Sequence, residues 1–222
     1  VDVSLVEPMV EDPSEVPTRA AQVAGFVLHM PSREVLGEIS LSYDRVFKMS
    51  EEELRKIEAA VRKKSTISTE EGLAAAEIIF KQAEKEGVVC ALAGGIAMHL
   101  YGYGRATHDV DLLADKDLSL PYEEKLSFGG LSHHVQVGAK KIIVDVIVRD
   151  DLYRNFYDAA LREARRNEDG WLILNPEWMV VLKFMAARSK DILDLLWMLR
   201  EPGLVDRDKV QQCFEQVLGK LG

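Results

Sequence analysis

Residues 88–114, VVCALAGGIAMHLYGYGRATHDVDLLA, decide how the rest of this chain is organised. The stretch opens with six uncharged residues, 88–93, a short β-prone run typical of a buried strand. Gly94 and Gly95 then predict a turn into a short helical run. A second strand follows over residues 107–113. We therefore expect a strand, a glycine turn, a helix and a second strand in direct succession.

Two aspartates lie on the second of these strands. Because side chains alternate across a strand, Asp109 and Asp111 share one face and lie about 7 Å apart by the rise per residue. Like charges this close repel each other unless a cation lies between them. Mg²⁺ is such a cation, because proteins bind it through one or two carboxylates together with substrate phosphates. The pair therefore predicts a magnesium site.

A third carboxylate is expected on a later strand. Residues 133–137 and 141–148 flank Gly138-Ala139, which predicts a β-hairpin. In its second strand Asp145 interrupts an apolar run, IIVDVIV. A lone carboxylate there is costly unless it is paired or binds a metal; the alternative is that this part of the sheet face meets solvent. Taken with the aspartate pair, the metal interpretation is favoured.

The glycine pair, followed after thirteen residues by Asp109-x-Asp111, resembles the signature of the DNA polymerase β-like nucleotidyltransferase superfamily. The resemblance implies that Gly94 and Gly95 open a helix that holds the nucleotide phosphates. It also implies that the aspartates, with Asp145 as third ligand, bind two Mg²⁺ ions, for which Mn²⁺ can substitute. The chain departs from the pattern at Gly95, where many members have serine. A contact to the γ-phosphate would then come from backbone N–H groups at the helix start.

Within that superfamily, the chain is most similar to the minimal and abortive-infection toxin-type branches. The residues that carry this likeness are Tyr101-Gly102, Arg105, Thr107, Lys183, Arg188, Lys190, Asp191 and Asp194. The resemblance spans residues 88–199, half the chain, and implies a nucleotide site that includes Arg105, Thr107, Lys183, Lys190 and Asp191. The alternative for the later residues is a set of ordinary local ion pairs, Arg188 with Asp191 and Lys190 with Asp194.

Helices are expected before and after these strands in the sequence. Ser50 and Glu53 form a capping box that predicts one helix, and Ser68 or Thr69 caps a second that Gly87 ends. Residues 151–166 are predicted to be helical with a basic end at Arg162, Arg165 and Arg166, and 171–174 to form a short strand. Further helices are predicted over 176–199, with a break near Arg188, and over 206–218.

Length and composition fit a small α+β protein. A chain of 222 residues, 47% of them hydrophobic, can bury one good core. We expect a nucleotidyltransferase-like mixed sheet with flanking helices over residues 49–150, and a C-terminal helical region over 151–222 that completes the nucleotide site. Residues 1–48, rich in proline and acidic residues at their start, predict an arm or small ribbon. This arm is either a surface extension or a segment for partner binding or dimer swapping.

Charge and cysteine content restrict the function further. A net charge of −9 argues against sequence-independent wrapping of nucleic acid, although a local basic groove is compatible with it. Two cysteines without a disulfide framework favour a reducing cytoplasm, with both thiols in the core. The longest uncharged run, residues 88–104, contains four glycines and is shorter than a membrane span.

These observations predict a Mg²⁺-dependent enzyme that moves a nucleoside monophosphate from an NTP to a hydroxyl. Asp145 is also expected to act as general base, and Lys183 and Lys190 to neutralise the departing pyrophosphate. The acceptor is left open between transfer RNA, a protein and a small molecule, and so is a toxin with an antitoxin partner. Two other classes remain alternatives. One is a nucleotide-binding module without turnover, and the other is a protein that works by contact alone.

Overall fold

The structure is a computed structural model that describes residues 66–186 and 188–219. These residues fall into two compact units that meet in the sequence between Asn175 and Pro176, and each is described by itself. The predictions for residues 1–48 and for the helix beginning at Ser50 lie outside the described residues.

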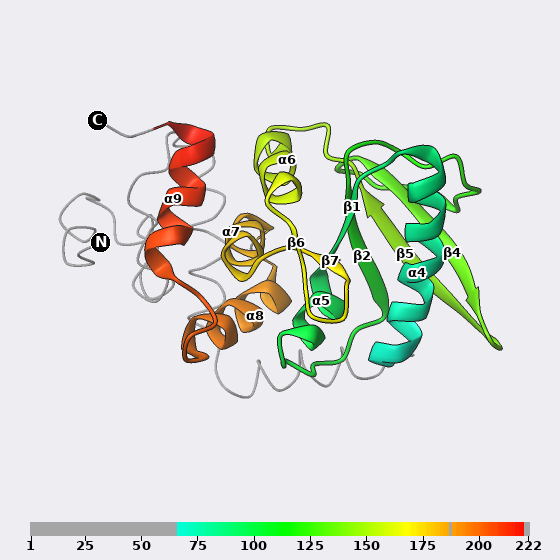
Figure 1. The fold of residues 1–222 in the computed structure, drawn as a ribbon, viewed down its shortest axis with the longest axis horizontal. Helices are drawn as coiled ribbons and strands as arrows, with labels where there is room; N and C mark the ends of the chain where they lie inside the picture. The colour runs from blue at the N-terminus through cyan, green and yellow to red at the C-terminus, as the bar shows by residue number, and fades with distance from the viewer. Residues whose placement is uncertain (1–65, 187, 220–222) are drawn as a thin grey trace. The chain divides into compact units, whose positions relative to one another are not determined.

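Seven strands of the first unit form one mixed sheet in the order β3-β4-β5-β2-β1-β7-β6 (Figure 1). The strands are β1 (Cys90–Ala93), β2 (Asp109–Ala114), β3 (Glu124–Lys125), β4 (Gly130–Val137), β5 (Lys140–Ile147), β6 (Arg165–Arg166) and β7 (Leu172–Ile173). The pairs β2–β5 and β1–β7 are parallel, and the other four are antiparallel. Among the described residues, three helices accompany the sheet: α4 (Thr69–Glu86), α5 (Gly94–Leu100) and α6 (Arg154–Arg162). This architecture confirms the predicted α+β class.

Helix α4 is defined at both ends by local sequence signals. The Ser68 side chain accepts a hydrogen bond from the backbone N–H of Glu71, and the Glu71 carboxylate accepts one from the backbone N–H of Ser68. This reciprocal pair is the capping box that starts a helix. At the other end Gly87 adopts a left-handed conformation, with φ 63°, and stops it. The predicted second helix is therefore confirmed.

Helix α4 covers the face of the sheet that lies opposite Asp111. Cys90 of β1 lines one pocket together with residues of α4, so its side chain points towards that helix. Its register partner is Ala114, which shares a face of β2 with the fully buried Leu112 and Val110. The other face of β2, which carries Asp109 and Asp111, therefore points away from α4. Both aspartates are only partly buried.

The predicted hairpin is confirmed as β4 and β5, which pair in antiparallel register up to Val137 and Lys140. The predicted helix over 151–166 is only partly correct. Helix α6 ends at Arg162, and Arg165 and Arg166 form strand β6, paired with β7. Pairing with a neighbouring strand satisfies the backbone groups of these exposed residues without a helix.

Residues 151–175, predicted as part of the C-terminal helical region, belong with the sheet. Leu92 of β1 pairs in parallel with Ile173 of β7, and the backbone N–H of Leu174 donates to the Leu92 carbonyl oxygen at 3.0 Å. These contacts join residues that are far apart in the sequence, so local sequence patterns do not predict them.

The described part of the second unit consists of α7 (Pro176–Ala186), α8 (Ser189–Arg200) and α9 (Arg207–Leu218). The predicted break falls at Arg188, whose backbone is extended, with ψ 156°. Phe184 of α7 packs edge-on against Phe214 of α9, with ring centroids 5.9 Å apart. None of the described helices is both long and apolar enough to cross a membrane.

Candidate metal and nucleotide site

Asp109, Asp111 and Asp145 come together at one point on the sheet. The parallel pairing of β2 and β5 places Asp111 directly opposite Asp145, and Asp109 lies two residues earlier on the same face of β2. One oxygen from each of the three carboxylates lies within 4.8 Å of the others, and each residue is partly buried. The convergence of these three carboxylates, predicted from sequence, is confirmed. We call them the aspartate cluster.

Gly94 lies directly against the aspartate cluster. Its φ is 57°, and a Cβ atom built on it would lie 1.7 Å from Oδ2 of Asp111. A side chain at this position would therefore displace the carboxylate, in addition to straining the backbone. The glycine turn and the aspartate strand thus fit together sterically.

Gly95 makes a similar fit with Thr107. A Cβ atom on Gly95 would lie 2.3 Å from Oγ1 of Thr107. The Thr107 hydroxyl is 3.2 Å from Oδ1 of Asp109 and 3.3 Å from the Asp109 carbonyl oxygen, and Thr107 is only 3% exposed. Thr107, which the resemblance assigns to the nucleotide site, therefore contacts a member of the aspartate cluster directly.

Ser132 is a site residue that sequence analysis missed. It lies on β4 opposite Asp145, is 4% exposed, and its hydroxyl donates to Oδ1 of Asp145 at 2.6 Å. The predicted hairpin contains the signal that could have found it. A Gly138-Ala139 turn sets the strand register, and that register makes Ser132 the partner of Asp145.

The loop that contains Arg105 is held by His99. Nε2 of His99 lies 2.5 Å from the Arg105 carbonyl oxygen, and Nδ1 lies 2.9 Å from Oγ1 of Thr69 at the start of α4. Nε2 donates to the carbonyl, and in a neutral imidazole Nδ1 then accepts from the Thr69 hydroxyl. These contacts fit a structural role for His99. The Arg105 guanidinium is partly buried and donates to the Ala106 carbonyl oxygen at 3.0 Å.

The second unit holds the predicted lysine–aspartate residues. Lys183 is 6% exposed, and its ammonium contacts Asp194 and lies 3.6 Å from Oδ1 of Asp191. Nε of Arg188 donates to Oδ2 of Asp191 at 2.6 Å. We call these four residues the buried ion network. Lys190, which lies on α8 with Asp191 and Asp194, is partly exposed.

The contacts of the ion network can be compared with the two local ion pairs predicted from sequence. The Arg188–Asp191 pair forms, whereas Asp194 is paired with Lys183 from α7. Burial by itself raises the pKa of Asp191, but the charges of Lys183 and Arg188 outweigh it and hold the pKa below its ordinary value. In the second unit, Lys183 therefore joins α7 to α8.

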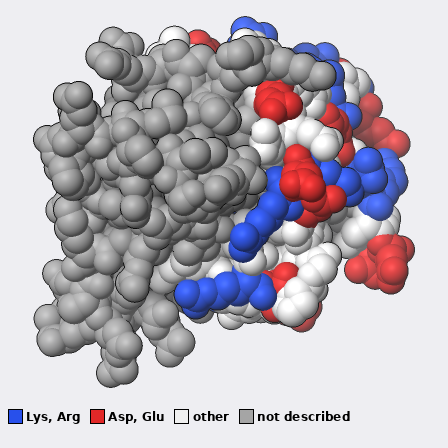
Figure 2. Space-filling view, turned by 90° about the vertical axis from the view of Figure 1, so that its left-hand side faces the viewer, with Lys and Arg blue, Asp and Glu red and all other residues white. Residues whose placement is uncertain are grey.

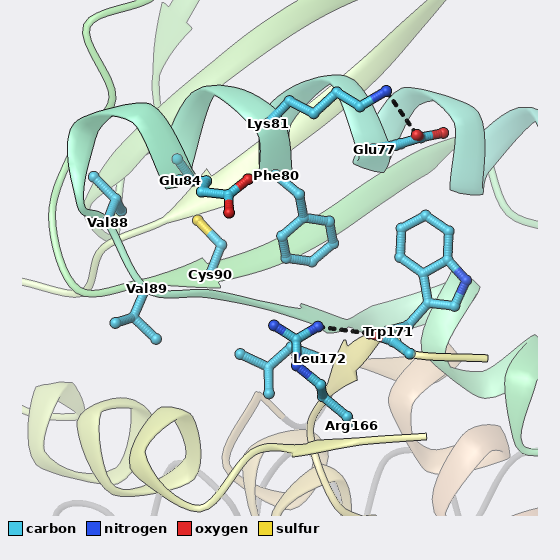
Figure 3. Close-up of a pocket in the computed structure, with 12 residues that line it drawn as sticks. Glu77, Phe80, Lys81, Glu84, Val88, Val89, Cys90, Arg166, Trp171 and Leu172 are labelled. Atoms are coloured by element: carbon cyan, nitrogen blue, oxygen red, sulfur yellow. Dashed lines mark hydrogen bonds and ion pairs between the residues drawn. The ribbon is translucent and has the colours of Figure 1, made fainter. Parts of the chain in front are cut away.

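A separate pocket of about 510 Å³ opens between α4 and the β6–β7 hairpin (Figure 3). Phe80 and Trp171 lie side by side at one end, with ring centroids 5.9 Å apart, and Arg166 donates to the Gly170 carbonyl oxygen at 2.7 Å. Burial raises the pKa of the Cys90 thiol to about 12, which disfavours the reactive thiolate. The pocket lies on the α4 side of the sheet, away from the aspartate cluster.

Charged side chains of both signs are interspersed on the face in Figure 2, over the described part of the chain. That pattern differs from the one-sign basic surface that non-specific nucleic-acid binding uses. On this face, the described residues therefore do not form a basic surface of that kind.

Among solved structures, the chain is similar to a protein of related description. It is an antigenic nucleotidyltransferase-like protein from Paracoccidioides brasiliensis, 19% identical, with a TM-score of 0.45 over 68% of this chain and 89% of that one. A likeness this distant does not bear on function. No protein-family model matches the sequence, and no curated protein matches it either.

Proposed function

We propose that the protein is a Mg²⁺-dependent nucleotidyltransferase that moves a nucleoside monophosphate from an NTP to an acceptor hydroxyl. The observation that carries the proposal is the aspartate cluster, three carboxylates on two parallel strands with one oxygen each within 4.8 Å. The sequence resemblance to the DNA polymerase β-like superfamily supports the same reaction.

The residues fit a hard divalent ion. The donor set consists of carboxylate oxygens, which Mg²⁺ and Mn²⁺ prefer. Gly94 supports the fit, because the space that its side chain would fill belongs to Asp111. Asp109, Asp111 and Asp145 would hold the metal. When bound, divalent ions activate the attacking oxygen and stabilise the leaving phosphate oxygen of an in-line displacement.

The protein's own groups then have separate tasks. The Asp145 carboxylate accepts the proton of the acceptor hydroxyl. The acceptor oxygen bonds to the α-phosphorus as the bond to pyrophosphate breaks. The Ser132 hydroxyl, which donates to Oδ1 of Asp145, holds that carboxylate in place during the transfer.

We also propose the nucleotide contacts that the resemblance implies. They involve Gly94, Gly95, Arg105, Thr107, Lys183, Lys190 and Asp191. Of the two lysines, Lys190 is the more exposed, while the Lys183 ammonium already contacts two aspartates. Lys190 is therefore the stronger candidate for a pyrophosphate contact.

The acceptor, the partner and the cellular setting belong to the same proposal. A transfer RNA, a protein side chain and a small molecule each offer a suitable hydroxyl. The toxin-type resemblance supports a toxin that an antitoxin partner holds in check. Both cysteines are buried and neither forms a disulfide, which agrees with a cytoplasmic protein.

Label transfer tests this proposal. The protein is incubated with each α-³²P-labelled NTP, Mg²⁺ and either total cell RNA or lysate, and the products are separated by size. We expect a labelled acceptor with wild-type protein and none with Asp109→Asn/Asp111→Asn. Asp117→Asn, the same change at an exposed aspartate, is the control and keeps activity.

Two outcomes point to the other classes. Stabilisation by NTP and Mg²⁺ without any labelled product indicates a nucleotide-binding module. The absence of both stabilisation and label indicates a protein that works by contact. Either result contradicts the transferase proposal.

A further inference from the structure

Each of the two outer carboxylates of the aspartate cluster contacts a buried hydroxyl. Ser132, 4% exposed, donates to Oδ1 of Asp145 at 2.6 Å, and Thr107, 3% exposed, lies 3.2 Å from Oδ1 of Asp109. The two hydroxyls come from different parts of the chain. One is on β4 and the other precedes β2.

A hydroxyl at this position limits how the carboxylate can bind a metal. Oδ1 of Asp145 already accepts the Ser132 proton on one of its two lone pairs, so a metal chelated through both oxygens would share Oδ1 with the hydroxyl and weaken or bend that bond. A hydrogen bond to a charged group is stronger than one between neutral groups, so the bond resists this change. The arrangement favours one oxygen from each outer aspartate.

Divalent ions differ in what they require from carboxylates. Ca²⁺ takes six to eight oxygens at about 2.3–2.6 Å and often binds a carboxylate through both of its oxygens. Mg²⁺ demands an octahedron of oxygens at about 2.0–2.1 Å, to which each carboxylate contributes one. A site whose carboxylates are each restricted to one oxygen therefore suits the smaller ion.

We propose that Ser132 and Thr107 are positioning residues that make the aspartate cluster select Mg²⁺ and Mn²⁺ over Ca²⁺. This inference rests on the proposed function, because it concerns the same metal site. The steric fit of Gly95 against Thr107 supports it, since a side chain on Gly95 would push the hydroxyl away from Asp109.

The test measures metal affinity without nucleotide or turnover. Mn²⁺ and Ca²⁺ titrations are followed by calorimetry, with free Mn²⁺ also followed by electron paramagnetic resonance. The variants are Ser132→Ala and Thr107→Val, which remove the hydroxyls while nearly keeping volume. Loss of a residue that orients a metal ligand lowers affinity about 10–100-fold. We expect Mn²⁺ affinity to fall at least about 10-fold in Ser132→Ala, while Ca²⁺ affinity holds or rises.

Two matched controls accompany these variants. Ser127→Ala makes the same change at an exposed residue in the loop before β4 and leaves both affinities unchanged. Thr107→Ser keeps the hydroxyl and retains the Mn²⁺ preference that Thr107→Val loses. Thermal unfolding in EDTA confirms that each variant is folded. If Ser132→Ala fails to fold, the Thr107 pair carries the test alone.

The results separate this inference from the proposed function. Equal loss of both ions, or loss of neither, overturns the selectivity role although the wild type still binds metal. A wild-type protein that binds no divalent ion overturns the proposed function itself. A fall in the ratio of Mn²⁺ to Ca²⁺ affinity in both hydroxyl-free variants supports the inference.

Discussion

The aspartate cluster and the buried ion network use the same kind of side chain for different ends. In the second unit, Asp191 and Asp194 are 1% and 0% exposed and contact Lys183 and Arg188. In the first unit, three partly buried carboxylates lie next to one another, and two of them contact neutral hydroxyls. In a network of matched, desolvated charges, the loss of one member leaves another charge buried without compensation, whereas acidic groups gathered within reach of solvent can take up a cation.

The largest expected effect is on stability, in the ion network. Asp194→Ala leaves the Lys183 ammonium with one carboxylate fewer in a buried site. Breaking such a pair costs about 3–5 kcal/mol. Urea unfolding should show this loss, while the matched change Asp117→Ala at an exposed site stays within about 0.5 kcal/mol. A loss below about 1 kcal/mol for Asp194→Ala would mean that the two regions do not differ in the way described.

The next effect concerns the fit between the glycine turn and the cluster. Gly94→Ala brings a Cβ atom to 1.7 Å from Oδ2 of Asp111 and puts alanine at φ 57°. The left-handed backbone alone costs about 1–2 kcal/mol, and displacement of the carboxylate weakens Mn²⁺ binding. Calorimetry and thermal unfolding measure the two effects. Gly104→Ala, where a Cβ atom would meet nothing within 4 Å, serves as the control and changes neither.

Removal of metal should lower the free energy of unfolding through the aspartate cluster and not through the ion network, and by less than the two substitutions above. An ion that binds only the folded protein stabilises it by about 1.4 kcal/mol at ten times its Kd. We expect EDTA to abolish this increment in wild type and to have no effect on Asp109→Asn/Asp111→Asn. Melting temperatures with and without Mg²⁺ provide the measurement. An increment that persists in the double variant would locate the ion elsewhere.

The smallest effect is the pH dependence of the ion network. The folded-state pKa of Asp191 lies below its ordinary value, so ionised Asp191 contributes stability above the unfolded pKa of about 3.9. That contribution is lost as pH falls through the folded-state pKa. Asp191→Asn should therefore weaken the dependence of unfolding free energy on pH in the acid range. Urea unfolding across that range checks it, and an unchanged slope would contradict the assignment.

Much of the aspartate cluster could be predicted from local sequence. Alternation along β2 places Asp109 and Asp111 on one face, and the apolar run around Asp145 marks it as a carboxylate that needs a partner. The capping box at Ser68 and the stop at Gly87 likewise depend on neighbours within a few residues. These predictions succeed because the interactions involved are local.

Other features could not be obtained this way. The burial of Lys183 with Asp194 joins residues on two helices. The hairpin turn sets Ser132 opposite Asp145, but only the structure shows that the buried hydroxyl donates to the carboxylate. Strand β6 was missed because a short exposed arginine pair has helical propensity of its own, and only β7 beside it makes a strand favourable.

The sequence by itself determined the strands on either side of the glycine turn, the later hairpin, the aspartate pair and the ends of α4, because each follows from side-chain periodicity, turn residues or capping over a few residues. Only the tertiary structure decided that β2 lies parallel to β5, so that Asp111 and Asp145 meet, and that buried hydroxyls hold the outer carboxylates. The pairing of β2 with β5 joins segments far apart in the chain, and the energies of all these contacts depend on burial that no local pattern contains.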